Sequence, residues 1–78
     1  MEIQKYVFAF CENVKELRKR RNLSKTEMAR LLSISPRTLS LIENYIIPKS
    51  LNVAVLFKIE QNFDIPAEEL FAPIKKTT

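Results

Sequence analysis

The 78-residue chain contains no glycine, no histidine and no tryptophan, and it has one cysteine. Without glycine, no position can take a positive φ at low cost, which disfavours tight hairpins and favours helices. A single cysteine cannot form an internal disulfide, and without histidine there is no zinc-binding set, so we expect a reducing compartment and no metal. Since no apolar run approaches the roughly 20 residues of a membrane span, we expect a cytoplasmic protein with no membrane contact.

Most residue patterns that support catalysis are missing as well. Histidine is absent, there is no Gly-rich phosphate loop, and no pair of carboxylates is placed for general acid–base chemistry. We therefore predict that the protein is not an enzyme and uses no cofactor.

The residues that are present favour a folded helical chain. Hydrophobic residues make up 46% and charged residues 28% of the chain, which is too apolar for intrinsic disorder. Leucine, isoleucine, glutamate, lysine and arginine dominate, a composition that favours helices. We predict one all-α domain over residues 1–78, small enough that a partner subunit would add to its stability.

The net charge of +4 is unevenly distributed. Residues 15–37 hold eight Lys or Arg and two Glu, giving +6, whereas the remaining five Lys and seven acidic residues give −2. A basic segment of this kind is typical of a surface that binds a polyanion. It is also compatible with an ordinary solvated face, and charge alone does not separate the two interpretations.

A helix over residues 3–20 is predicted by apolar residues at helical spacing. They form one stripe, Ile3, Tyr6, Val7, Phe10, Val14 and Leu17. Phe8 lies off this stripe, so we expect it either to be exposed or to touch something outside the monomer. Cys11 flanks the stripe and is interpreted as a small buried hydrophobe rather than a reactive thiol.

Residues 23–44 contain two short helices, and each has a clear start signal. Ser24 and Glu27 form a capping box that opens a helix over 25–32, and Ser35 followed by Pro36 opens a second helix over 36–43. Because only two residues separate the first helix from the second cap, the two axes must cross steeply. This is the geometry of a helix-turn-helix.

Burial in these two helices leaves one face of the second helix pointing outward. Met28, Ala29 and Leu32 are predicted to be buried in the first helix, and Leu39 and Ile42 in the second. The side chains that then face away from the core are Arg37, Thr38, Ser40 and Leu41.

The remainder of the chain is predicted to complete the bundle. Pro48 keeps the loop after Asn44 out of a helix, and the next helix begins after a cap at Ser50 or Asn52 and ends near residue 62. A short last helix starts at Pro66, is held to the core by Leu70 and Phe71, and precedes a frayed tail over 75–78.

Taken together, the chain resembles the Cro/Xre-type, or lambda-repressor-like, helix-turn-helix domain of phage repressors and small bacterial regulators. The resemblance covers about residues 12–71 and leaves 3–11 as an extension of the first helix. It rests on the segments Leu17-Arg18, Leu23-Ser24, Met28-Ala29, Ser35 to Ser40, Ile42 to Asn44, Phe63 to Ile65 and Glu69 to Phe71. The fold it implies is a five-helix bundle with the helix-turn-helix at helices 2 and 3.

The resemblance also implies roles for individual residues. Arg18 would pair with Glu43 as a structural ion pair, and Asn44 would meet a phosphate. The first residue of the second helix is usually a glutamine that contacts phosphate and braces the first residue of the third helix. This chain has Lys25 and Pro36 at these positions, so the bracing amide pair cannot form. Positions where the family commonly has glycine hold Asn22, Ser33, Tyr45 and Asp64. Serine and tyrosine tolerate positive φ poorly, so we expect local differences at the inter-helix turn and in the Tyr45 loop.

Two sets of residues are predicted to contact double-stranded DNA. Exposed side chains near the start of a recognition helix reach base edges, and the set expected to do so is Arg37, Thr38, Ser40, Pro36 and Leu41. Arg37 is preferred because its fork can bind guanine O6 and N7 together. The set expected to hold phosphates is Ser24, Lys25, Asn44, Tyr45 and Lys49.

The function predicted from these residues is that of a sequence-specific transcriptional repressor. One such unit makes few base contacts, so we expect a homodimer on an inverted repeat with half-sites about 34 Å apart. The apolar residues left for dimerisation are Phe8, Ile46, Ile47, Phe71, Pro73 and Ile74, and the resemblance favours the C-terminal three.

An alternative from a different class is a protein-interaction module, such as the antitoxin of a toxin–antitoxin pair. Its partner would be a toxin or an antirepressor. The observation that supports this alternative is the additional apolar residues in Tyr6 to Phe8 and in Ile46-Ile47.

Overall fold

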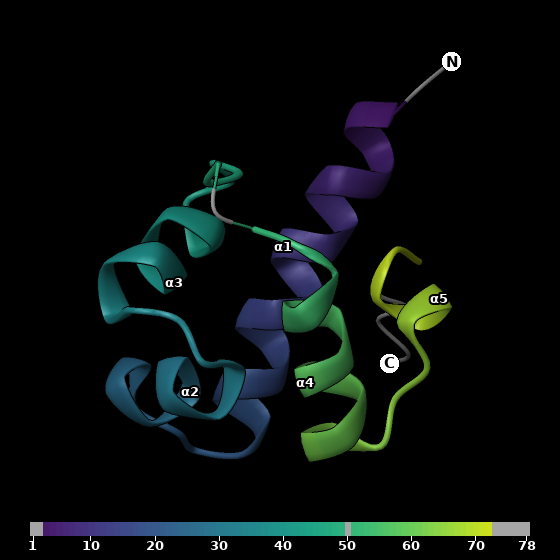
Figure 1. Ribbon diagram of the computed structural model, residues 1–78. Coiled ribbons are helices and arrows are strands. Elements are labelled where there is room, and N and C mark those ends of the chain that lie inside the picture. Colours follow the sequence, from purple (N-terminus) through teal and green to yellow (C-terminus); the bar gives the residue numbers. More distant parts are fainter. Residues whose placement is uncertain (1–2, 50, 73–78) are drawn as a thin grey trace.

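The computed structural model describes residues 3–49 and 51–72 and contains five helices in that part of the chain (Figure 1). They are α1 (Ile3–Arg20), α2 (Lys25–Leu32), α3 (Pro36–Glu43), α4 (Val53–Phe63) and α5 (Ala67–Leu70). No strand occurs among the described residues. The prediction of an all-α bundle with a helix-turn-helix at α2 and α3 is confirmed.

In the view of Figure 1, α2 and α3 lie to the left of α1, and α4 and α5 lie to its right. α2 packs on α3 and α4, while α1 packs on α3 and α5. All five helices supply some of the largest fully buried side chains, namely Val14, Met28, Leu39, Ile59 and Leu70. The single core therefore sets the angle at which α3 is presented.

The first helix has the predicted bounds, but its apolar stripe is only partly covered. Phe10 and Val14 are buried, whereas Tyr6 is 53% exposed. The N-terminal half of α1 extends past the other helices (Figure 1), so none of the other four helices covers the stripe at Tyr6. Cys11 is fully buried, as expected for a small core residue.

The helix ends follow the capping signals, with two refinements. Asn52 caps α4, its Oδ1 accepting from the N–H of Ala54 over 2.9 Å; the other candidate, Ser50, lies outside the described residues. At α5, Pro66 is the cap and not the first helical residue, which is Ala67. The proposed stop at Pro73 and the tail over 75–78 also lie outside the described residues.

Four non-glycine residues adopt left-handed backbone conformations. Their φ values are 54° at Asn22, 60° at Ser33, 65° at Tyr45 and 54° at Asp64. The expectation of altered geometry at Ser33 and Tyr45 was therefore wrong, because both keep a backbone shape that usually belongs to glycine. At Ser33 the left-handed residue ends α2, and its N–H bonds back to the last turn of that helix.

The last helix is held to α1 by one amide and one ring pair. Asn13 Nδ2 donates to the carbonyl oxygens of Leu70 at 2.7 Å and Ala72 at 2.8 Å. Phe71 stacks on Phe10 with ring centroids 5.4 Å apart. Leu70 and Phe71 thus pin α5 to the core as predicted. No helix among the described residues has the length and apolar character needed to cross a membrane.

Candidate nucleic-acid interface

The start of α2 is built by its capping box. Ser24 Oγ accepts from the N–H of Glu27 over 3.1 Å, and Glu27 Oε1 accepts from the N–H of Ser24 over 2.9 Å. The hydrogen bond that the Ser24 N–H donates to the Glu27 carboxylate is the main cause that lowers the pKa of this carboxyl. The box fixes where α2 begins and so places Lys25 as its first residue.

Lys25 makes a contact between the two helices. Its Nζ donates to Ser40 Oγ over 3.3 Å. The bracing amide pair of the family is absent, as the residue types require, and this bond joins α2 to the second turn of α3 instead. Lys25 itself remains exposed, so its charge is still presented to solvent.

The end of α3 is tied to α1 by an ion pair between Arg18 and Glu43. Arg18 Nε donates to Glu43 Oε2 over 2.7 Å, and Nη2 donates to Oε1 over 2.9 Å. Nη1 of the same guanidinium donates to the carbonyl oxygen of Leu23 over 3.1 Å. The hydrogen bond to Glu43 is the main cause that raises the pKa of Arg18. Both charged groups are therefore occupied inside the bundle.

The outward face of α3 is defined by what the opposite face buries. Leu39, Ile42 and Glu43 are buried. Arg37 and Leu41 are four residues apart, so they lie on the same face of the helix, away from the buried residues. Arg37 is exposed and Leu41 half-buried, and within the described residues no hydrogen bond or ion pair engages Arg37.

The other three residues of the predicted base-reading set lie around this face. Pro36 is exposed at the first position of α3, and Ser40 is half-buried beside Lys25. Thr38 turns to the opposite side, where its hydroxyl lies 2.8 Å from Ser35 Oγ.

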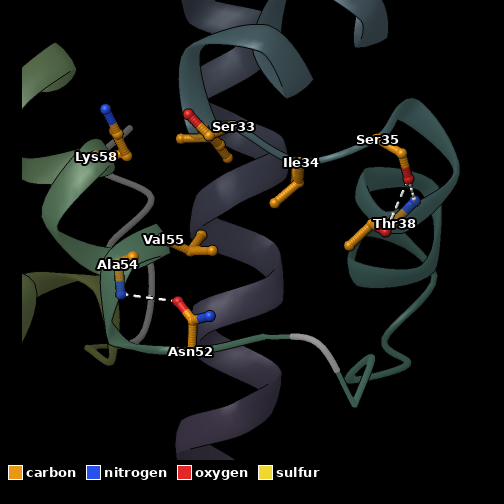
Figure 2. Close-up of a pocket in the computed structure, with 9 residues that line it drawn as sticks. Ser33, Ile34, Ser35, Thr38, Asn52, Ala54, Val55 and Lys58 are labelled. Carbon is orange, nitrogen blue, oxygen red and sulfur yellow. Dashed lines mark hydrogen bonds between the residues drawn. The ribbon is translucent and has the colours of Figure 1, made fainter.

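Figure 2 shows Thr38 on one wall of an open groove between the α2–α3 turn and α4. Ser35 caps α3 from this wall by accepting from the N–H of Thr38 over 3.0 Å. Asn52 caps α4 from the other wall, and Lys58 lines the groove on the same helix. Thr38 therefore faces α4 more than it faces outward.

The predicted phosphate contacts near the end of α3 are placed in different ways. Asn44 Nδ2 donates to the carbonyl oxygen of Ser40 over 2.7 Å, which leaves one amide N–H on an exposed side chain. Lys49 is exposed. Tyr45 instead donates its hydroxyl to Glu12 Oε1, and this carboxylate raises the pKa of the phenol. The Tyr45 proton is therefore already used within the chain.

Exposed positive charge surrounds the helix-turn-helix. Lys19, Arg20 and Arg21 are exposed at the end of α1, and Arg30 is exposed in the last turn of α2. Arg20 pairs with Glu16 over 3.3 Å at the surface, and Arg21 lies over the ring of Phe63 at 5.0 Å. No group of acidic, cysteine or histidine side chains suited to a metal occurs in the described part of the chain.

Sequence reasoning missed the contact between α1 and the loop after α3. The rings of Phe8 and Tyr45 stack with centroids 4.6 Å apart and an interplanar angle of 6°. Two features of the sequence pointed toward it: a tyrosine at a position where glycine is usual, and an aromatic residue off the apolar stripe of α1. Neither feature indicated that the two residues contact each other.

The fold and the site together define a small helix-turn-helix protein of the DNA-binding class. The chain belongs to the helix-turn-helix family HTH_3, of the Cro/C1 type, whose model matches residues 14–70 and thus more than half of the chain. This is a family of DNA-binding domains and supports a role as a DNA-binding regulator. No match was found among curated proteins or among solved structures.

Proposed function

We propose that this protein is a sequence-specific transcriptional repressor that binds an inverted-repeat operator as a homodimer. The observation that carries the proposal is the outward face of α3, where Arg37 is exposed and unengaged within the described residues. A helix with this exposure, tied down at its far end by Arg18 and Glu43, is suited to enter a major groove as a rigid unit.

Base recognition in this proposal depends first on Arg37. Its guanidinium can bind guanine O6 and N7 together, which is worth about 1–3 kcal/mol of discrimination against other bases. Pro36 and Leu41 offer apolar contact, for example to a thymine methyl group. Ser40 supplies a hydroxyl beside Lys25 for a base edge or a phosphate. Thr38 is left out of this set because its hydroxyl lies against Ser35 in the groove beside α4.

Phosphate contacts in this proposal come from the ends of α2 and α3. Lys25 supplies a mobile charge, Asn44 an amide N–H, Lys49 a second charge, and Ser24 lies at the α2 amides that can face a phosphate oxygen. Tyr45 is left out of this set because its hydroxyl is donated to Glu12.

The homodimer follows from the small number of base contacts. One α3 offers about one strong bidentate contact, which falls short of the discrimination that an operator needs. The chain is 30 Å across its longest axes, a size that allows equivalent helices of two adjacent copies to reach successive major grooves about 34 Å apart.

The proposal is tested with Arg37→Ala after bound sites have been selected from random DNA at a stated salt concentration. We expect binding to a single half-site to fall by a factor of about 5 to 150, following the discrimination energy of one bidentate contact, and binding of the dimer to two half-sites to fall by about the square of that factor. Binding to unrelated DNA should fall by much less. Competition binding assays with selected and unrelated duplexes measure both.

Arg30→Ala is the matched control, because Arg30 is an exposed arginine of α2 that carries the same charge. It should weaken specific and non-specific binding alike. If Arg37→Ala and Arg30→Ala give the same pattern, the assignment of Arg37 to base recognition is wrong.

A further inference from the structure

Four exposed apolar residues gather at the end of the molecule away from α2. They are Phe8 on α1 and Tyr45, Ile46 and Ile47 in the loop that follows α3, and they are here named the Phe8 patch. Their side chains are 54%, 41%, 52% and 42% exposed. Because the N-terminal half of α1 and this loop lie at the same end of the molecule (Figure 1), they form one surface.

The Phe8 patch is held in shape by contacts within the chain. The face-to-face stack of Phe8 and Tyr45 fixes the loop against α1, and the hydroxyl of Tyr45 is anchored on Glu12. The left-handed backbone of Tyr45, φ 65°, turns the chain so that the ring lies on the helix. Ile46 N–H donates to the carbonyl oxygen of Leu41 over 2.9 Å, which ties the patch to the last turns of α3.

We propose that the Phe8 patch is the surface through which two copies of this chain associate. This inference rests on the proposed function, from which the two-fold symmetry of the pair is taken. The half-exposed rings of Phe8 and Tyr45 present roughly 200 Å² between them. With the two isoleucines the patch reaches the range of about 300–600 Å² that often marks functional surface on a monomer. It supplies the apolar centre of an interface that needs about 800 Å² per partner.

Charge favours this surface over the basic region of residues 15–37 for a second copy. Residues 15–37 carry a net charge of +6, so two copies meeting through that region would repel each other. The charged residues next to the patch in sequence are Lys5, Glu12, Glu43 and Lys49. Glu12 is engaged by Tyr45, and Glu43 is buried in its pair with Arg18. The Phe8 patch therefore combines apolar area with little net charge.

The position of the patch leaves the base-reading start of α3 open. Residues 45–47 come just after the end of α3, next to the proposed phosphate contacts Asn44 and Lys49, whereas Pro36 and Arg37 lie at the other end of the helix. A second copy on the patch therefore sits beside the end of each recognition helix and leaves its start uncovered (Figure 1). The proposed interface differs from the C-terminal residues Phe71, Pro73 and Ile74 that the family resemblance favoured. Phe71 already stacks on Phe10, and Pro73 and Ile74 lie outside the described residues.

The test compares Phe8→Glu with Phe57→Glu in the full chain. Phe57 on α4 is 59% exposed and lies outside the patch, so both variants lose an exposed phenylalanine and gain the same charge. Sedimentation equilibrium should show a self-association constant at least about tenfold weaker for Phe8→Glu and one within about twofold of the parent for Phe57→Glu. Ile46→Glu, which leaves the aromatic stack intact, should repeat the loss, and circular dichroism checks folding of each variant.

Outcomes on DNA separate this inference from the proposed function. Phe8→Glu should lose cooperative binding to a duplex with two half-sites while keeping the affinity of the parent for a single half-site. The patch is excluded as the interface if self-association is unchanged in Phe8→Glu and Ile46→Glu, if Phe57→Glu abolishes it, or if the parent is monomeric both free and on DNA. A parent that instead captures a different protein through the patch overturns the inference too. Failure of the parent to bind any duplex would count against the proposed function alone, because sedimentation still measures the patch.

Discussion

Glu43 is the residue that joins recognition to stability. It is a charged side chain only 6% exposed, and both of its carboxylate oxygens accept from Arg18, whose side chain is 16% exposed. A buried charge that loses its partner is costly, whereas an exposed pair contributes little. Breaking the pair of Arg18 and Glu43 is therefore expected to cost much more stability than breaking the exposed pair of Arg20 and Glu16 in α1.

Replacing Glu43 with Gln tests this at the scale of one residue. The variant leaves the Arg18 charge without its partner, so we expect the free energy of unfolding to fall by about 3 kcal/mol, at the lower end for buried pairs because Arg18 retains some contact with water. Urea denaturation measures the loss. Glu16→Gln breaks the exposed pair with Arg20 and should cost at most about 0.5 kcal/mol. Equal losses in the two variants would show that burial does not set the contribution of the pair.

The chain contains no glycine, so the left-handed backbone positions at the ends of its helices are occupied by other residues. Asn22, Ser33, Tyr45 and Asp64 all carry positive φ. Asparagine and aspartate tolerate this region through their short polar side chains, whereas serine and tyrosine pay a larger steric cost. At Tyr45 the stack on Phe8 offsets this cost, but no hydrogen bond from the Ser33 side chain does so among the described residues.

Ser33→Gly tests the inter-helix turn. Glycine removes a steric cost of about 1–2 kcal/mol for the left-handed backbone but loses about 0.5–1 kcal/mol through the greater freedom of the unfolded chain. We expect a net gain of about 0.5–1 kcal/mol in the free energy of unfolding, measured by thermal and chemical denaturation. Asn22→Gly should change stability by only a few tenths of a kcal/mol, since asparagine already suits this region. A destabilised Ser33→Gly would mean that the turn carries no such strain.

The whole molecule separates its charge from its exposed apolar surface. The basic residues run from α1 through α2 to the start of α3, and the Phe8 patch lies at the end of the molecule away from α2. Neutralised phosphates release counterions, so each lysine that meets the DNA backbone steepens the salt dependence of binding. Lysines at the two ends of the molecule should therefore differ in their effect on this slope.

Lys25→Ala and Lys5→Ala compare the two ends. Both lysines are exposed, and each variant removes one positive charge. For Lys25→Ala we expect weaker binding to all sequences and a shallower slope of log K against log salt, by about 0.9 for one protomer on a half-site and about 1.8 for the dimer on two. Lys5→Ala should leave the slope unchanged. Filter-binding or anisotropy titrations between low and moderate salt give both slopes, and identical slopes would remove Lys25 from the phosphate set.

The amino-acid sequence by itself determined the helices and their order. Ser24 with Glu27, Ser35 with Pro36, and Asp64 mark helix ends through contacts that span no more than four residues, and apolar spacing of three and four defines the buried faces. Such signals are local and do not depend on the rest of the fold. The pairing of Arg18 with Glu43 was anticipated through family resemblance, because nothing local links residues 25 positions apart.

Only the tertiary structure decided which surface residues are committed and which are free. Tyr45 and Glu12 are 33 positions apart, and Asn13 and Leu70 are 57 apart, so their meeting depends on the angles at which α1, α3 and α5 pack. Because of these packing angles, the Tyr45 hydroxyl bonds to Glu12 and is not available to a phosphate. Tyr6 stays exposed because the N-terminal half of α1 extends beyond the other helices. Helix formation follows neighbours along the chain, whereas exposure follows the packing of the whole core, because a side chain is buried only where another element comes to cover it.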